Sequence, residues 1–84
     1  MKHEVTWTRN AQVGLAYLWV NGMDPQFIRD TRDQITQLLE SDPQGNGTPA
    51  AEGLFAIQIP PVAAMYEISS VDKKVTVVSA GRAT

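Results

Sequence analysis

The side chains that could carry chemistry are few and are spread along the chain. The sequence contains seven Lys and Arg residues, nine Asp and Glu residues, one histidine and no cysteine. Without cysteine there can be no thiolate nucleophile, disulfide or thiolate metal site. The single histidine, His3, has no second histidine or carboxylate at metal-ligand spacing, so metal binding and base catalysis are not expected of it. We therefore expect no metal and no cofactor.

The carboxylates and glycines also lack the spacing of a catalytic or nucleotide site. Glu40, Asp42 and Glu52 are too dispersed to form a carboxylate pair for general acid and base catalysis. Gly45 and Gly47 are not followed by Lys-Ser or Lys-Thr, and the next predicted element is a strand, which excludes a phosphate-binding loop. The net charge of −2 gives no general attraction for nucleic acid. Function therefore has to be sought in the elements that position these residues.

Length and composition limit those elements to one small domain. The 84 residues, 43% of them hydrophobic, predict a single domain spanning residues 1–84 with one thin core. No run of about 18 apolar residues is present, so no membrane span is expected. The chain begins without an apolar signal region. We therefore expect a cytoplasmic location.

A strand and a helix are predicted at the start of the chain. Residues 4–8 alternate so that Val5 and Trp7 share one strand face, and Thr8 can cap the helix that follows. This helix covers residues 9–20 and ends at Asn21-Gly22. Its predicted buried stripe consists of Ala11, Leu15, Leu18 and Trp19. We expect Trp7 and Trp19 to pack in the core between helix and sheet.

A second helix is predicted directly after the first. Asp24 is its N-cap and Pro25 its first residue, and it extends for about 17 residues, or roughly 25 Å. The predicted buried stripe consists of Ile28, Ile35, Leu38 and Leu39. The two helices therefore form a hairpin.

The second half of the sequence predicts a sheet. Residues 41–53 are rich in Pro, Gly, Asn and Ala without a period, which predicts a mobile loop. Strands follow over residues 54–59, 62–68 and 75–79, separated by short turns. The predicted fold is therefore α+β with the order β-α-α-β-β-β, in which the helical hairpin packs on one face of a mainly antiparallel four-stranded sheet.

This layout resembles that of RelE/ParE-like toxins, the plasmid stabilisation family, over nearly the whole chain. The resemblance is carried by the order and spacing of residues 5–7 with Ala11, residues 35–39 followed by Asp42-Pro43, and residues 52–55, 66–68 and 75–78. It implies a bacterial toxin of a type II toxin–antitoxin pair, which inhibits translation or DNA gyrase and is neutralised by a cognate antitoxin.

The resemblance also implies where chemistry would reside. RelE-like members cut mRNA on the ribosome without a metal, using Lys and Arg side chains that stabilise charge on the phosphate. This sequence has Ala56, Gln58 and Ala63 at positions where those nucleases carry basic residues, and only Arg82 matches a basic position. Arg82 is therefore the one candidate catalytic residue. The missing cations argue against ribosome-dependent mRNA cleavage and leave open whether the chain is an enzyme.

A partner surface is predicted on the sheet face that points away from the helices or along an exposed edge strand of the open sheet. Strand alternation places Gln58, Met65, Glu67 and Thr76 on that face, whereas Tyr66 is expected to pack in the core rather than stack on a base. Two readings remain at this point: a toxin with an antitoxin partner, or a catalytically inactive toxin-like fold that acts as a protein-binding module. A homodimer is also left open.

Overall fold

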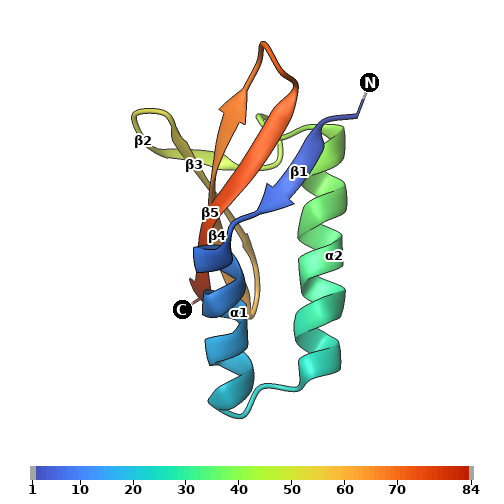
Figure 1. The fold of residues 1–84 in the computed structure, drawn as a ribbon, viewed down its shortest axis with the longest axis vertical. Coiled ribbons are helices and arrows are strands. Elements are labelled where there is room, and N and C mark those ends of the chain that lie inside the picture. Colours follow the sequence, from blue (N-terminus) through green and yellow to red (C-terminus); the bar gives the residue numbers. More distant parts are fainter. Residues whose placement is uncertain (1, 84) are drawn as a thin grey trace.

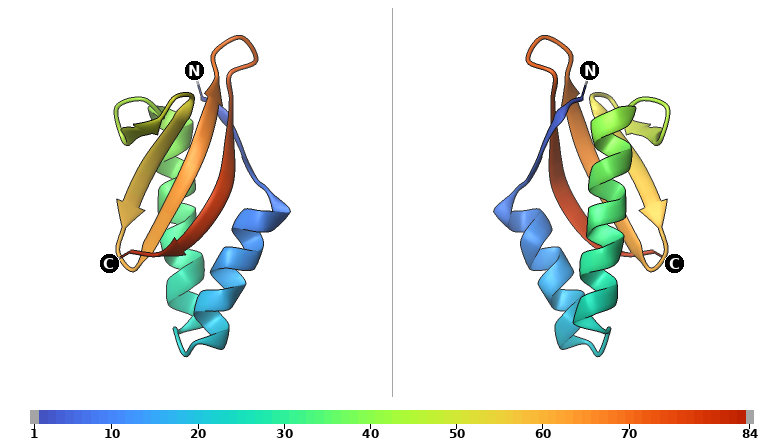
Figure 2. Two further views of the ribbon diagram at one scale, coloured as in Figure 1. Left: turned by 90° about the vertical axis from the view of Figure 1, so that its left-hand side faces the viewer. Right: turned by 90° about the vertical axis from the view of Figure 1, so that its right-hand side faces the viewer.

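The computed structural model describes residues 2–83, so residues 1 and 84 of the predicted domain lie outside the described part. In chain order the elements are β1 (Glu4–Trp7), α1 (Arg9–Val20), α2 (Pro25–Ser41), β2 (Thr48–Ala51), β3 (Leu54–Ile59), β4 (Val62–Ser69) and β5 (Lys74–Arg82) (Figure 1). Both helices lie on one side of the sheet (Figure 2). The predicted α+β fold, a helical hairpin on one face of a mainly antiparallel sheet, is confirmed.

The sheet has five strands, in the order β1-β5-β4-β3-β2. β1 pairs with β5 in parallel, and the other three pairings are antiparallel. The predicted count of four strands was wrong because β2 lies inside the segment that we predicted as a loop. All four β2 residues are exposed, so they show no alternation. Pro49 lacks an N–H, which is tolerated in a strand at the edge of a sheet.

The helices begin and end where their capping residues predict. The Thr8 hydroxyl accepts a hydrogen bond from the Ala11 N–H at 3.2 Å, and Asp24 accepts one from the Gln26 N–H at 2.9 Å. Each acceptor satisfies a backbone donor that has no partner within its helix. The turn between the helices passes through Gly22 at φ 99°, which is the conformation that glycine favours after a helix end.

The core lies between the helical hairpin and one face of the sheet. Its buried residues are Ala11, Leu15, Leu18, Ile28, Ile35, Leu39, Ile57, Val62, Ala64, Tyr66, Val75 and Val77. α1 approaches β5 so closely that a Cβ added at Gly14 would overlap the carbonyl oxygen of Ala80. Gly14 therefore sets the distance between the first helix and the sheet.

The two tryptophans have different environments. Trp7 is half-buried against the core, and its indole N–H donates to the Thr36 hydroxyl at 3.0 Å. Trp19 is 58% exposed, so its predicted place in the core was wrong. The reason is positional: Leu18 in the same turn is buried, whereas Trp19 lines the open groove between α1, α2 and β1.

Candidate functional site

The sheet face that points away from the helices, called the open face below, is organised in cross-strand rows. Ala56 pairs with Met65, which pairs with Ser79. Glu67 pairs with Thr76, and Gln58 pairs with Ala63. Directly paired residues lie on the same side of a sheet. The four residues predicted to bind a partner, Gln58, Met65, Glu67 and Thr76, therefore share the open face; Gln58 and Glu67 are exposed and the other two are half-buried.

The part of the open face next to the turn between β3 and β4 carries no positive charge at three positions, Ala56, Gln58 and Ala63. Gln58 and Ala63 are directly paired, and Ala56 lies two residues away on β3, so the three positions lacking basic residues are neighbours. The charged residue nearest to them in these rows is Glu67, an anion. A phosphodiester placed here would lose its hydration without gaining a cationic partner.

Arg82 lies on the other side of the sheet. It is the last residue of β5 and pairs with Val62, a buried residue of the helix side. If side chains alternated regularly along β5 from Thr76, Arg82 would lie on the open face. However, Tyr66 pairs with Val77 and its neighbour Met65 pairs with Ser79. Val78 is therefore an extra residue in β5, and the alternation reverses after it. The structure therefore does not bring Arg82 together with the four open-face residues.

Tyr66 is fully buried at the centre of β4, as predicted. Its hydroxyl donates to the Pro43 carbonyl oxygen, and its ring stacks on Phe55 with the centroids 5.7 Å apart. Burial raises the pKa of the Tyr66 hydroxyl, and the nearby Asp42 carboxylate raises it further. Since both the ring and the hydroxyl are engaged inside the protein, Tyr66 has a packing role and is not available to stack on a nucleotide.

The segment before β2, which we predicted to be a mobile loop, is held by specific hydrogen bonds. The Asn46 side chain donates to the Leu38 carbonyl at the end of α2 at 2.9 Å. The Gly45 N–H donates to the Asp42 carboxylate at 3.0 Å. A Cβ at Gly47 would overlap the Tyr66 hydroxyl, so the loop lies directly on that group. These contacts fix the edge of the sheet next to β3.

His3 is tied to the end of α2 through its backbone. Its N–H donates to the Glu40 carbonyl at 2.9 Å, while its side-chain Nδ1 is buried without a hydrogen-bond partner among residues 2–83. In that same part of the chain, no three His, Cys, Asp or Glu side chains are placed to hold a metal ion. Neither of the described helices is long and apolar enough to cross a membrane.

Two grooves were not predicted from the sequence. One, of about 650 Å³, lies between α1, α2 and β1 and includes Trp19, Arg29 and Arg32. The other, of about 710 Å³, lies between α1 and the end of β5 and includes Tyr17 and Arg82. One signal in the sequence could have indicated them: α1 has no charged residue after its first position.

No protein-family model and no curated protein matches this sequence. Solved structures do match it in fold. A chain of the RelBE2 toxin–antitoxin complex from Mycobacterium tuberculosis has a TM-score of 0.82 at 16% identity, covering 99% of this chain and 100% of that one. A chain of the chromosomal ParDE system of P. aeruginosa has a TM-score of 0.77 at 20% identity, covering 99% of this chain and 98% of that one. The isolated E. coli RelE toxin has a TM-score of 0.67 at 14% identity, covering 98% of this chain and 85% of that one. This chain therefore has the RelE/ParE-like toxin fold.

Proposed function

We propose that this chain is the toxin of a bacterial type II toxin–antitoxin module, acting in the cytoplasm and neutralised by a cognate antitoxin. The observation that carries the proposal is the agreement in fold over nearly the full length of both chains, with RelE-type and ParE-type structures alike. The fold alone permits other functions. The proposal therefore depends on an activity that can be measured in cells.

The target that we propose is the translation machinery or DNA gyrase, reached without cleavage of RNA by this chain. Ala56, Gln58 and Ala63 leave the open face without cations beside the turn between β3 and β4. Phosphodiester cleavage needs both charge stabilisation and proton transfer, and each supplies orders of magnitude in rate. A surface of small neutral side chains instead supports inhibition by binding.

A second candidate is a toxin-like fold that has lost its activity and binds a partner protein only. The same uncharged positions, Ala56, Gln58 and Ala63, favour this candidate, as does the net charge of −2. It predicts soluble, folded protein that does not slow growth. The toxin proposal predicts arrest under the same conditions.

The experiment is tightly controlled induction of this chain in a bacterial host, with growth measured against chain level by immunoblot. Wild type and Lys2→Ala, which removes an exposed cation elsewhere, should both arrest growth. Arrest that is lost in Arg82→Ala, with the variant folded and equally abundant, would assign the toxic surface to the helix side of the sheet, where Arg82 lies, rather than to the open face. Undiminished growth with folded wild-type protein would reject the toxin proposal and leave the binding module.

A further inference from the structure

Both tryptophans of the chain line the groove between α1, α2 and β1. They come from different elements, Trp7 from β1 and Trp19 from the last turn of α1. Trp19 is 58% exposed there, although burial of an indole ring is strongly favourable. Exposed apolar surface rimmed by polar side chains marks ligand-binding grooves. The groove therefore has the aromatic wall that a flat ligand needs.

The two helical walls of the groove are regular stripes of side chains. They follow the spacing i, i+3, i+4 and i+7, which places side chains on one face of a helix. The α1 stripe consists of Gln12, Leu15, Ala16 and Trp19, and the α2 stripe consists of Pro25, Ile28, Arg29, Arg32 and Thr36. The small side chain of Ala16 leaves the middle of the α1 wall hollow. The volume of about 650 Å³ lies within the range of about 300–1,000 Å³ that is typical of small-molecule sites.

The β1 end of the groove is held in place by hydrogen bonds. The Trp7 indole N–H donates to the Thr36 hydroxyl at 3.0 Å, and that hydroxyl donates to the Arg32 carbonyl at 2.9 Å. The Gln12 side chain donates to the Trp7 carbonyl at 3.1 Å. These bonds join β1 to both helices. Because the wall is already ordered, a ligand loses little affinity to ordering side chains.

The polar side of the groove is cationic. Arg29 and Arg32 both line it, and no Asp or Glu does. The ion pairs found within residues 2–83 are Arg32 with Asp33, at 3.3 Å, and Lys74 with Glu4. Arg29 therefore has no carboxylate partner in that part of the chain. The pair of Arg32 with Asp33 is exposed and contributes little, so an anion in the groove can compete for Arg32. A carboxylate matches the planar fork of a guanidinium group.

The dimensions of the groove favour a compact ligand. The α1 stripe extends over seven residues, or about 10 Å. Because the helices form a hairpin, Trp7 bounds the groove at one end and Pro25, the first residue of α2, bounds it at the other. A groove bounded at both ends admits a small molecule more readily than a chain that has to enter and leave.

We propose that this groove binds a small aromatic carboxylate, with its ring on Trp19 and its carboxylate on Arg29 and Arg32. The site goes beyond the proposed toxin function and does not rest on it. A ligand held between α1 and α2 binds the folded hairpin and not the unfolded chain. It should therefore raise the melting temperature as its concentration rises.

The test uses the full chain and three probes with the same number of carbon atoms. Naphthoate has the ring and the negative charge, undecanoate has the charge without the ring, and naphthylmethylammonium has the ring with the opposite charge. Binding is followed by the amide and indole N–H signals of isotopically labelled protein, in which the two indole signals report on Trp7 and Trp19.

Naphthoate should bind saturably, with a dissociation constant of about 1 mM or tighter, and should shift both indole signals. Undecanoate should bind about threefold or more weakly because it cannot stack on an indole. Naphthylmethylammonium should bind about tenfold or more weakly because it meets two like charges.

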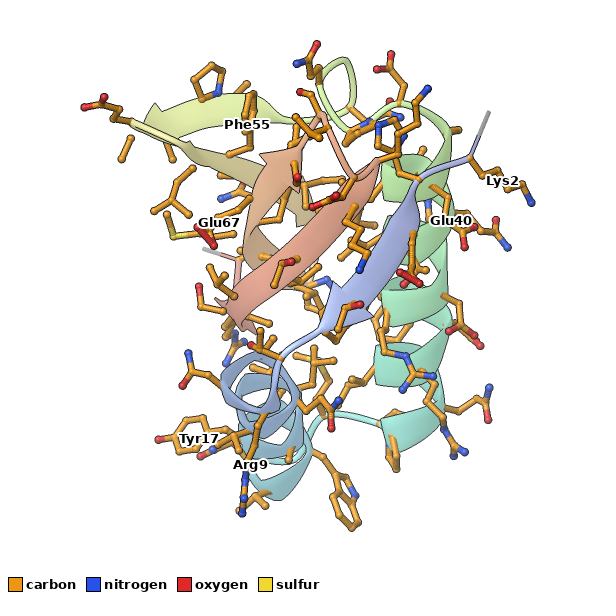
Figure 3. All side chains as sticks on the ribbon, turned by 45° about the horizontal axis from the view of Figure 1, so that its top comes forward. Lys2, Arg9, Tyr17, Glu40, Phe55 and Glu67 are labelled. Atoms are coloured by element: carbon orange, nitrogen blue, oxygen red, sulfur yellow. The ribbon has the colours of Figure 1, made fainter. Side chains whose placement is uncertain are left out.

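Charge variants test the role of the two arginines. Arg29→Gln with Arg32→Gln should weaken naphthoate by about tenfold or more and abolish its advantage over naphthylmethylammonium. Lys2→Gln with Arg9→Gln makes the same change in net charge outside the groove, and Figure 3 shows Arg9 projecting from α1 away from α2. That control should bind naphthoate as wild type does.

Aromatic variants test the role of Trp19. Trp19→Gln should weaken naphthoate by about threefold or more, and Trp19→Phe, which keeps a ring, should restore most of the affinity. Because Trp19 is 58% exposed, both variants should unfold thermally close to wild type. Tyr17→Gln removes an exposed ring of α1 outside the groove and should leave the affinity unchanged.

Four results would overturn the proposal. They are no saturable binding of naphthoate by wild type at millimolar concentration, equal affinity for naphthoate and either other probe, shifts centred on Val13 and Arg82, and unchanged affinity in the folded Arg29 and Arg32 variant. None of these results depends on growth arrest. A chain that arrests growth but does not bind naphthoate would keep its proposed function and lose this site.

Discussion

Replacing Tyr66 with phenylalanine removes one buried hydroxyl and little else. The side chain is 0% exposed, and its O–H donates a hydrogen bond to the Pro43 carbonyl oxygen. The variant keeps the ring and its stacking on Phe55 but leaves that carbonyl without its partner. A buried polar group left unsatisfied costs about 1–3 kcal/mol. In a domain of this size each kcal/mol lowers the melting temperature by about 4–8 °C.

Thermal unfolding followed by circular dichroism measures this loss. Tyr17→Phe makes the same chemical change at a side chain that is 67% exposed, so its free energy of unfolding should stay within about 0.5 kcal/mol of wild type. If Tyr66→Phe were as stable as Tyr17→Phe, the hydroxyl would not hold the loop before β2 as described.

The pH dependence provides an independent check on the same hydroxyl. Burial and the Asp42 carboxylate raise the pKa of Tyr66 above its ordinary value of 10.0. The folded state therefore favours the neutral hydroxyl, and its stabilising contribution is complete below about pH 10 and is lost as the pH rises through the folded-state pKa. The stability gap between wild type and Tyr66→Phe should narrow in alkaline solution. A gap that stays constant or widens there would refute the reasoning.

Three further predictions concern packing and chemistry. Gly14→Ala should destabilise the fold by about 1–3 kcal/mol because its added Cβ overlaps the Ala80 carbonyl. The control Gly81→Ala should be tolerated because its added Cβ meets no atom within 4 Å. Equal melting temperatures of the two variants would contradict this prediction. Trp7→Phe should cost about 1 kcal/mol in chemical denaturation because the Thr36 hydroxyl loses its indole donor, and an unchanged midpoint would count against that bond. Purified chain added to a bacterial translation extract should leave mRNA uncut in primer-extension mapping, and new ends inside codons would overturn the assignment of the open face as a non-nuclease surface.

Local signals predicted the helices and β3 well. Thr8, Asp24 and Pro25 mark helix starts through hydrogen bonds and backbone geometry that depend on neighbouring residues only. β3 spans residues 54–59 as predicted, because its inward residues Phe55, Ile57 and Ile59 pack in or against the core. Where buried and exposed positions alternate along the chain, the residue types alone predict the strand and which of its faces packs in the core.

The failures share a different cause, since each depends on a partner distant in sequence. β2 pairs through an exposed segment with no alternation, and Trp19 is exposed because it lines the open groove between α1, α2 and β1. The composition of the open face was predicted from residue types, but that groove became visible only once the core-facing side of α1 was known.

The most direct test of the central claim is the rate of macromolecular synthesis after induction of this chain in bacteria. Incorporation of labelled amino acid or labelled thymidine would be followed within the first generation, with the integrity of mRNA measured in parallel. Inhibition of translation or of DNA gyrase predicts that one of the two rates falls first while mRNA stays at full length. Both rates continuing at the uninduced level, with folded chain present, would contradict the account.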